Sequence, residues 1–235
     1  MKKNLILLLT FALATSSFAL YGNSQINERF LFNDFDDGIV YFDTGHVTKA
    51  KLNYGTVSQL FYFVDKDSSV LVLKNISEIT AIVIADHTFE KVKGGKFYEK
   101  IPIGNNFLYV NWKNKLISAK IGAYGTENSI APIDNYYTLS AGSANYINAL
   151  KFQENVKVLP ANRYYIKEKG KFRSFSSFKE MARIFKVSVK IMDRFVKYEK
   201  LNFNNVENVE KAFMFAVKLV PKKAEFNLQM QQNSD

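Results

Sequence analysis

The chain has 235 residues, of which 47% are hydrophobic and 15% aromatic, a composition that excludes a disordered protein and allows one or two domains with a hydrophobic core. It contains no cysteine, which excludes thiol catalysis and thiolate metal sites. The net charge of +10 indicates an anionic partner only if the charge is concentrated in one region, so its distribution along the chain matters most.

The first 19 residues have the three parts of a secretory signal peptide. Lys2 and Lys3 form a positive n-region, residues 5–13 are largely apolar, and residues 17–19 fit a small-x-small cleavage motif. The alternative is a membrane anchor, but the apolar run is shorter than the ~18 residues of a spanning helix. We therefore expect export to the periplasm or outer membrane, cleavage after Ala19, and no transmembrane span in the mature chain.

Residues 26–121 are typical of an antiparallel β domain. Short runs rich in Val, Ile, Phe and Tyr alternate with turn signals, and their length and spacing favour a sandwich, a roll or a small barrel. The turn signals are Asp37-Gly38, Thr44-Gly45, Asp65-Lys66-Asp67, Gly94-Gly95 and Gly104-Asn105.

The rest of the chain changes character twice. Residues 122–160 are rich in Gly, Ala, Ser and Asn without a clear period, which predicts a loop-rich connection. Residues 161–220 predict a basic β-hairpin, with its turn at Lys169-Gly170, followed by three helices, and residues 221–235 predict a flexible tail. The predicted fold class is therefore α+β: an antiparallel β sandwich, roll or small barrel followed by a small hairpin-plus-three-helix module.

The three helices have recognisable starts and faces. Ser176 or Ser177 can cap the first helix with Glu180 as the capping-box partner, and the third helix begins near Asn205. The second helix spans residues 189–200. Its apolar spacing predicts an inward face made of Ile191, Met192, Phe195 and Val196.

The acidic stretch of residues 32–46 raises the question of a metal site, because it holds four aspartates and His46. If Gly38 is taken as position 6 of a calcium loop of the EF-hand type, Phe35 and Thr44 stand where acids are required. Tight turns explain the stretch better. His46 and His87 are predicted to be structural or surface residues, and neither a metal site nor a cofactor is expected.

A second motif suggests a nucleophile. Ser176 and Lys179 match the Ser-x-x-Lys of penicillin-recognising serine enzymes. However, the Ser-x-Asn at residues 143–145 precedes this motif instead of following it, and the Lys-Thr-Gly element is absent. A serine at a helix start is ordinarily a cap, so the sequence favours a protein that is not an enzyme, although a pair of glycosidase carboxylates needs no motif.

The basic charge is concentrated in one segment. Residues 161–200 carry 12 Lys and Arg against 4 Asp and Glu, whereas residues 20–160 carry 14 of each and residues 201–235 carry 4 of each. The helical part of this segment has basic residues at i, i+4 and i+7 on two successive helices, which places each trio on one stripe. These candidate anion-binding residues are Lys179, Arg183, Lys186, Lys190, Arg194 and Lys197.

Two readings of this stripe remain open, a solvated helix face and an anion-binding surface. Export would make the partner an anionic envelope lipid, lipopolysaccharide or an acidic protein, and not nucleic acid. The leading hypothesis is a non-catalytic envelope protein that docks on an anionic surface or an acidic partner through this module. The alternatives are a hydrolase of an envelope polymer and a structural subunit.

The run from Gly38 to Leu73, together with "HTFEKV" and "GAYG" downstream, resembles a group of exported Bacteroidetes proteins of unknown function. The matching features are the signal peptide, Asn53-Tyr54 after the second strand, and a helical tail after Tyr164-Tyr165. The resemblance implies residence in the periplasm or outer membrane and no particular chemistry.

Overall fold

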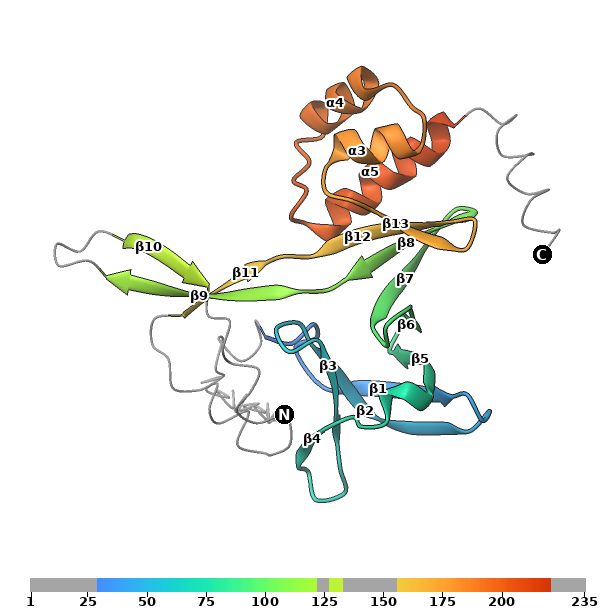
Figure 1. The fold of residues 1–235 in the computed structure, drawn as a ribbon, viewed down its shortest axis with the longest axis vertical. Coiled ribbons are helices and arrows are strands. Elements are labelled where there is room, and N and C mark those ends of the chain that lie inside the picture. The colour runs from blue at the N-terminus through green and yellow to red at the C-terminus, as the bar shows by residue number, and fades with distance from the viewer. Residues whose placement is uncertain (1–28, 122–126, 133–155, 221–235) are drawn as a thin grey trace, which may run out of the picture.

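The computed structural model describes residues 29–121, 127–132 and 156–220, so the predicted signal peptide and tail lie outside it. Within this part of the chain the fold is a large antiparallel sheet, a small three-stranded sheet and three helices (Figure 1). The predicted α+β class is confirmed. Figure 1 shows the helices packed over one end of the large sheet, and the small sheet extending away from it as an arm.

The large sheet has ten strands in the order β13-β12-β8-β7-β6-β5-β1-β2-β3-β4. Neighbouring strands are antiparallel and mostly consecutive in the chain, which is what short apolar runs joined by tight turns produce. The strands are β1 Asp36–Phe42, β2 Val47–Gly55, β3 Leu60–Val64, β4 Val70–Val72, β5 Ile79–Ile84, β6 His87–Lys91, β7 Phe97–Ile103, β8 Asn106–Asn111, β12 Arg163–Glu168 and β13 Lys171–Phe175, with a 3₁₀ turn, η1, at Ile76–Glu78 before β5.

The small sheet is formed by β10 (Glu127–Pro132), β9 (Asn114–Ile121) and β11 (Val156–Pro160), in that order. Two of its strands continue from the large sheet, because β9 follows β8 and β11 precedes β12. At the junction the Ala161 N–H donates to the Lys113 carbonyl (2.7 Å) and the Lys113 N–H donates to Oδ1 of Asn162 (2.9 Å).

Strands β10 and β11 lie in the segment 122–160 that the sequence predicted to be a loop-rich connection. Its small polar residues carry no apolar alternation, and these two strands are instead defined by their backbone pairing with β9. The sheet also crosses the predicted boundary of the helical module, since β12 pairs with β8 through Tyr164 opposite Val110. The hairpin is therefore the edge of the large sheet.

Most turn signals are confirmed, but one is wrong. Lys169 and Gly170 form the β12–β13 turn with φ values of 50° and 73°. Gly38, in contrast, lies inside β1, paired with Ala50 of β2 and Ile84 of β5. A Cβ on Gly38 would lie 2.6 Å from Cδ1 of Leu52 and 2.8 Å from the Val83 carbonyl oxygen. Glycine is present there because the neighbouring strand is too close for a side chain.

The inner face of the large sheet carries two hydrophobic clusters. One lies over β1, β2, β3, β5 and β6 and is centred on residues such as Leu52, Phe61 and Ile82, each no more than 2% exposed. The other lies between the helices and β7, β8, β12 and β13. Trp112, between β8 and β9, packs against both clusters. The two clusters therefore share one contact residue at the middle of the sheet.

The helices are α3 (Phe178–Ile184), α4 (Val189–Tyr198) and α5 (Val206–Leu219). The predicted serine cap is confirmed, because Oγ of Ser177 accepts from the Glu180 N–H (3.2 Å). The third helix begins at Asn205 as predicted, and Oδ1 of Asn205 caps it by accepting from the Asn208 N–H (2.9 Å). Helix α5 contacts the other two helices and strands β7 and β8. Its buried residues are Val206, Val209, Ala212, Phe213 and Ala216.

Candidate functional site

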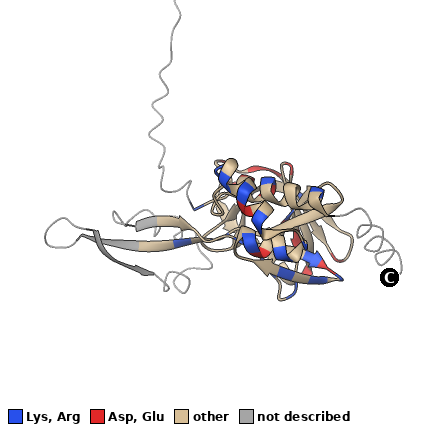
Figure 2. Cartoon of the chain, turned by 90° about the horizontal axis from the view of Figure 1, so that it is seen from above, with Lys and Arg blue, Asp and Glu red and all other residues tan. Residues whose placement is uncertain are grey.

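The six predicted anion-binding residues lie on α3, on α4 and in the turn between them, and every one is exposed. Figure 2, which looks down on the helical module, shows Lys and Arg distributed along its outer surface with few acidic residues among them. Of these six residues, Lys179 alone makes an ion pair with a described residue, a 3.9 Å contact with Asp193 that joins α3 to α4. The structure thus brings the six residues to one solvent-facing module.

Helix α4 has two distinct faces. Its inner face is held by Met192, which is fully buried, and by Phe195, whose ring stacks on Phe215 of α5 with centroids 3.8 Å apart and planes 5° apart. Its outer face carries Lys190, Arg194 and Lys197 at i, i+4 and i+7. The apolar inner face fixes which side of the helix the basic stripe presents to solvent.

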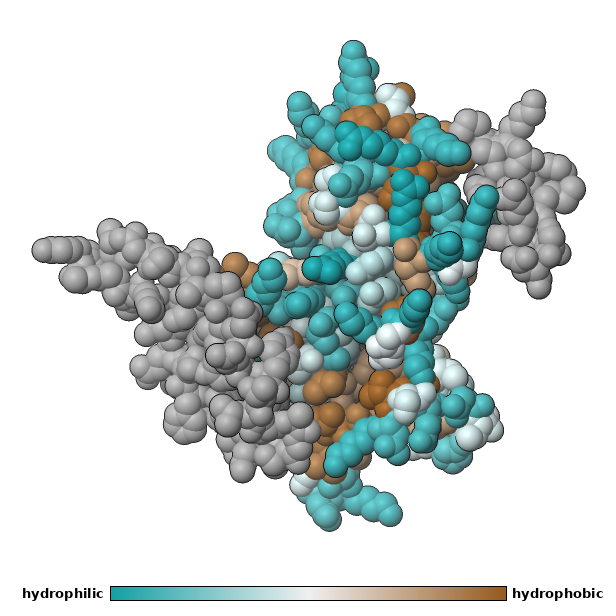
Figure 3. All heavy atoms as spheres, in the orientation of Figure 1, coloured by the Kyte–Doolittle hydropathy of each residue, from teal (hydrophilic) through white to brown (hydrophobic). Residues whose placement is uncertain are grey.

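The outer face of α4 is not purely polar. Ile191 is 45% exposed and Tyr198 is 84% exposed, and both lie next to the basic stripe in the helical repeat. The prediction that Ile191 faces inward is therefore wrong: its neighbour Met192 occupies the core position. Figure 3 shows the same mixture, with hydrophobic surface lying between hydrophilic side chains over the helical module.

The nucleophile reading of Ser176 and Lys179 finds no support in the geometry. The Ser176 hydroxyl donates to Oε2 of Glu180 (2.8 Å), which also accepts the Ser176 N–H (2.7 Å). These bonds lower the pKa of Glu180. Lys179 turns instead toward Asp193. Ser176 and Ser177 together make the start of α3, as a capping box does.

A partly buried polar cluster, which the sequence did not reveal, lies at the middle of the sheet and consists of His87, Glu99, Trp112 and Glu210. Glu99 points inward from β7 between the two hydrophobic clusters, and its side chain is 5% exposed. Its Oε1 lies 2.5 Å from Nδ1 of His87, and its Oε2 accepts the indole N–H of Trp112. Glu210 of α5 is close enough to interact electrostatically with Glu99 and His87.

The charges of this cluster shift one another. The hydrogen bond to Glu99 is the main cause that raises the pKa of His87, outweighing the opposing effect of burial, and the charges of Glu99, Asp86 and Glu210 act in the same direction. Burial raises the pKa of Glu210, with a further contribution from Glu99. Such a pair of carboxylates is also what a glycosidase would need.

One observation favours a structural role for Glu99. Both oxygens of Glu99 already accept hydrogen bonds, so neither is directed at a substrate. No group of three or more metal-ligating side chains is found among the described residues, here or elsewhere. The cluster satisfies buried polar groups where the two cores meet.

The acidic stretch forms part of a hairpin. Thr44 and Gly45 form the β1–β2 turn, where Gly45 has a φ of 82°. His46 follows, exposed, with Nε2 3.1 Å from the Thr48 hydroxyl. The neighbouring segment is held by Asn53, which is buried, and whose amide donates to the carbonyls of Phe32 (2.9 Å) and Asp34 (3.0 Å). These two hydrogen bonds give the buried Asn53 side chain a structural role.

Comparison with known proteins gives no functional lead. No family model, no curated protein and no solved structure matches this chain. In the part of the chain that the structure describes, no helix is both long enough and apolar enough to cross a membrane. The chain's own surfaces are therefore the remaining source of evidence on function.

Proposed function

We propose that this is an exported, non-catalytic protein of the cell envelope, and that it docks on an anionic lipid surface through the outer face of α3 and α4. The observation that carries the proposal is the composition of the α4 outer face, where Lys190, Arg194 and Lys197 stand beside the exposed Ile191 and Tyr198. Docking would use all six basic residues of the helical module.

The charge pattern supports binding to an anion over simple solvation. Acids three or four residues away offset lysines and arginines on a solvated helix face, and here Glu180 precedes Arg183 by three residues and Asp193 precedes Lys197 by four. Even so, five of the six basic residues make no ion pair with the residues the structure describes. Each Lys or Arg near an anionic membrane surface contributes about 1 kcal/mol of binding.

The exposed apolar residues favour lipid over an acidic protein as the partner. An amphipathic helix that lies at a membrane surface combines basic residues with apolar or aromatic ones, which enter the boundary between headgroups and acyl chains. Tyr198, 84% exposed at the end of α4, has an apolar ring and a polar hydroxyl, which suits that boundary. Ile191 has no comparable role in water.

Vesicle binding tests the proposal. The purified chain is titrated with phosphatidylglycerol vesicles and with phosphatidylcholine vesicles, across a series of salt concentrations. We expect binding to the anionic vesicles alone, weakening with salt because exposed charges are screened over ~8 Å at physiological ionic strength. A triple variant, K190E/R194E/K197E, should weaken binding by at least about 100-fold, since three contributions of about 1 kcal/mol are lost and three repulsive charges are added.

A matched triple reversal separates local from total charge. Lys49, Lys66 and Lys74 are exposed and lie on or beside β2, β3 and β4, at the other end of the large sheet. The K49E/K66E/K74E variant should retain most of the binding. Equal loss in both variants, or equal binding to neutral vesicles, would refute docking through the helical module. Full retention of vesicle binding in an I191S/Y198S double variant would contradict the role of these two apolar residues in lipid docking.

A further inference from the structure

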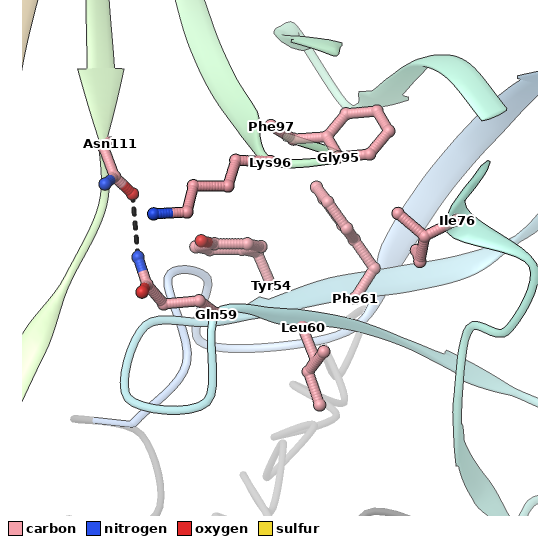
Figure 4. A pocket seen from close by; sticks show the side chains of 9 residues that line it. All are labelled: Tyr54, Gln59, Leu60, Phe61, Ile76, Gly95, Lys96, Phe97 and Asn111. Atoms are coloured by element: carbon pink, nitrogen blue, oxygen red, sulfur yellow. Dashed lines mark hydrogen bonds between the residues drawn. The ribbon is translucent and has the colours of Figure 1, made fainter. Parts of the chain in front are cut away.

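A pocket lies where the large sheet curls over its own inner face. Residues of β2, β3, η1, β7 and β8 line it, and its volume is about 220 Å³. The curl brings the β6–β7 turn over β3, although these elements are not paired in the sheet. Figure 3 shows hydrophobic surface in this lower half of the molecule, and Figure 4 shows the pocket from close by.

One end of the pocket is aromatic. Phe61 is the middle ring of this end. Its ring centroid lies 4.8 Å from that of Tyr54 and 5.5 Å from that of Phe97, and the contact with Phe97 is edge-to-face. Ile76 of η1 adds an aliphatic side chain beyond Phe61 (Figure 4). This end offers a compact apolar site to a ligand.

The other end is polar and cationic. Nε2 of Gln59 donates to Oδ1 of Asn111 (2.8 Å), which leaves the Nδ2 amide of Asn111 as a hydrogen-bond donor. Figure 4 shows the Lys96 side chain extended along the pocket toward this amide pair, with the Tyr54 hydroxyl on the same side. Lys96 makes no ion pair with any residue in the described ranges.

We propose that this pocket binds a small carboxylate with a compact apolar body, about the size of a single six-membered ring. The carboxylate would accept hydrogen bonds from Lys96 and from the amide of Asn111, and the apolar body would contact Phe61 and Phe97. The size follows from the volume, because 220 Å³ corresponds to the liquid volume of about seven waters. Lys96 is itself exposed and extends along the pocket, and a cation beside aromatic walls selects for an anionic head on an apolar body.

Cyclohexanecarboxylate is a suitable probe, because it has the right size and charge and does not absorb where tryptophan emits. Trp112 is the only tryptophan of the chain, and its carbonyl accepts the Tyr54 hydroxyl at the polar end of the pocket (3.4 Å). Its fluorescence should therefore change on binding. We expect saturable binding with a Kd of about 1 mM, which is within reach of so small a ligand. Cyclohexanemethanol, the neutral analogue, should bind at least about tenfold more weakly.

Two variants locate the site. Lys96→Met removes the ammonium and keeps an unbranched side chain, and it should raise the Kd by at least about tenfold. Lys93→Met is the matched control, since Lys93 is exposed in the same turn and does not line the pocket, and it should leave the Kd unchanged. Ile76→Phe, which fills the apolar end, should also weaken binding.

Three outcomes would overturn the proposal. One is the absence of saturable change up to about 20 mM probe, which leaves a water-filled pocket. Another is an equal Kd for Lys96→Met, Lys93→Met and the unaltered chain, which places the probe elsewhere. The third is equal affinity for the acid and the alcohol, which removes the role of the charge.

Discussion

Nδ1 of His87 lies 2.5 Å from Oε1 of Glu99, and this contact joins β6 to β7 at the point where the two hydrophobic clusters meet. The Glu99 side chain is 5% exposed, and that of His87 is 36% exposed, so the bond connects a buried group to a group that water can reach. The same carboxylate accepts the Trp112 indole N–H. One glutamate thereby ties two strands to the residue that both cores share.

The His87–Glu99 bond predicts that stability falls as pH rises through neutrality. The bond raises the pKa of His87 above its ordinary value of 6.5, so the folded state retains a proton that the unfolded state releases above about pH 6.5. The contribution is fully present below that pH and is lost as pH rises through the raised value. Glu210, whose pKa is also raised, acts in the same direction at lower pH. Urea unfolding midpoints measured from pH 6 to pH 9 should therefore decrease.

The other histidine provides the control. His46 is exposed, and among the described residues its side chain interacts with the Thr48 hydroxyl and the Phe42 ring. His46→Gln should keep the decrease above pH 6.5, whereas His87→Gln should flatten it. The same slope in both variants would mean that the His87–Glu99 bond does not control it.

Glu99→Gln should destabilise the fold by about 2 kcal/mol, even though it keeps the size of the side chain. Both oxygens of Glu99 are acceptors, but glutamine supplies one acceptor and one donor. The amide oxygen can still accept the Trp112 N–H, but His87 can accept the amide N–H only as a neutral ring without a proton on Nδ1, so the charge-assisted bond is lost. Glu168→Gln, on the exposed β12–β13 hairpin, is the control and should cost less than about 1 kcal/mol. Equal unfolding free energies for the two variants would contradict this account.

Gly38→Ala tests why glycine stands inside β1. Its new Cβ would meet Cδ1 of Leu52 at 2.6 Å and the Val83 carbonyl at 2.8 Å, and the carbonyl belongs to the backbone and cannot rotate away. Forcing extra volume into a packed site typically costs about 1–3 kcal/mol. Thermal unfolding should show a clear decrease in Tm. An unchanged Tm would mean that β1, β2 and β5 can move apart to accept the new Cβ without loss of stability.

The sequence predicted the fold class because its signals are local. Alternating apolar runs, the Lys169-Gly170 turn and the serine cap of α3 each act over a few residues, and the structure confirms them. The sequence did not predict two features, because each depends on residues that are far away along the chain. β10 and β11 are defined by their pairing with β9, and Gly38 is set by the approach of Val83 from β5.

The candidate sites divide in the same way. The basic residues at i, i+4 and i+7 could be placed on one stripe from spacing alone, and all of them are exposed. The polar cluster could not be predicted, because Glu99 in "KFYEKI" resembles any outward residue of a strand until β7 is seen between two cores. Ile191 was misassigned because the apolar spacing placed both Ile191 and its neighbour Met192 on the inner face, whereas the structure buries Met192 alone of the two.

Two serines at helix starts give a comparison within one module. Ser177 caps α3 through its hydroxyl, whereas Ser188 stands at the start of α4 without a side-chain capping bond. Ser177→Ala should therefore cost about 1 kcal/mol, and Ser188→Ala should cost clearly less. The helices share one hydrophobic cluster, so both losses are read in the same urea transition. Because α3 and α4 carry the basic surface, Ser177→Ala should also destabilise the helix that presents part of this surface, without altering its charge. Equal costs would show that the Ser177 hydroxyl does not stabilise the start of α3.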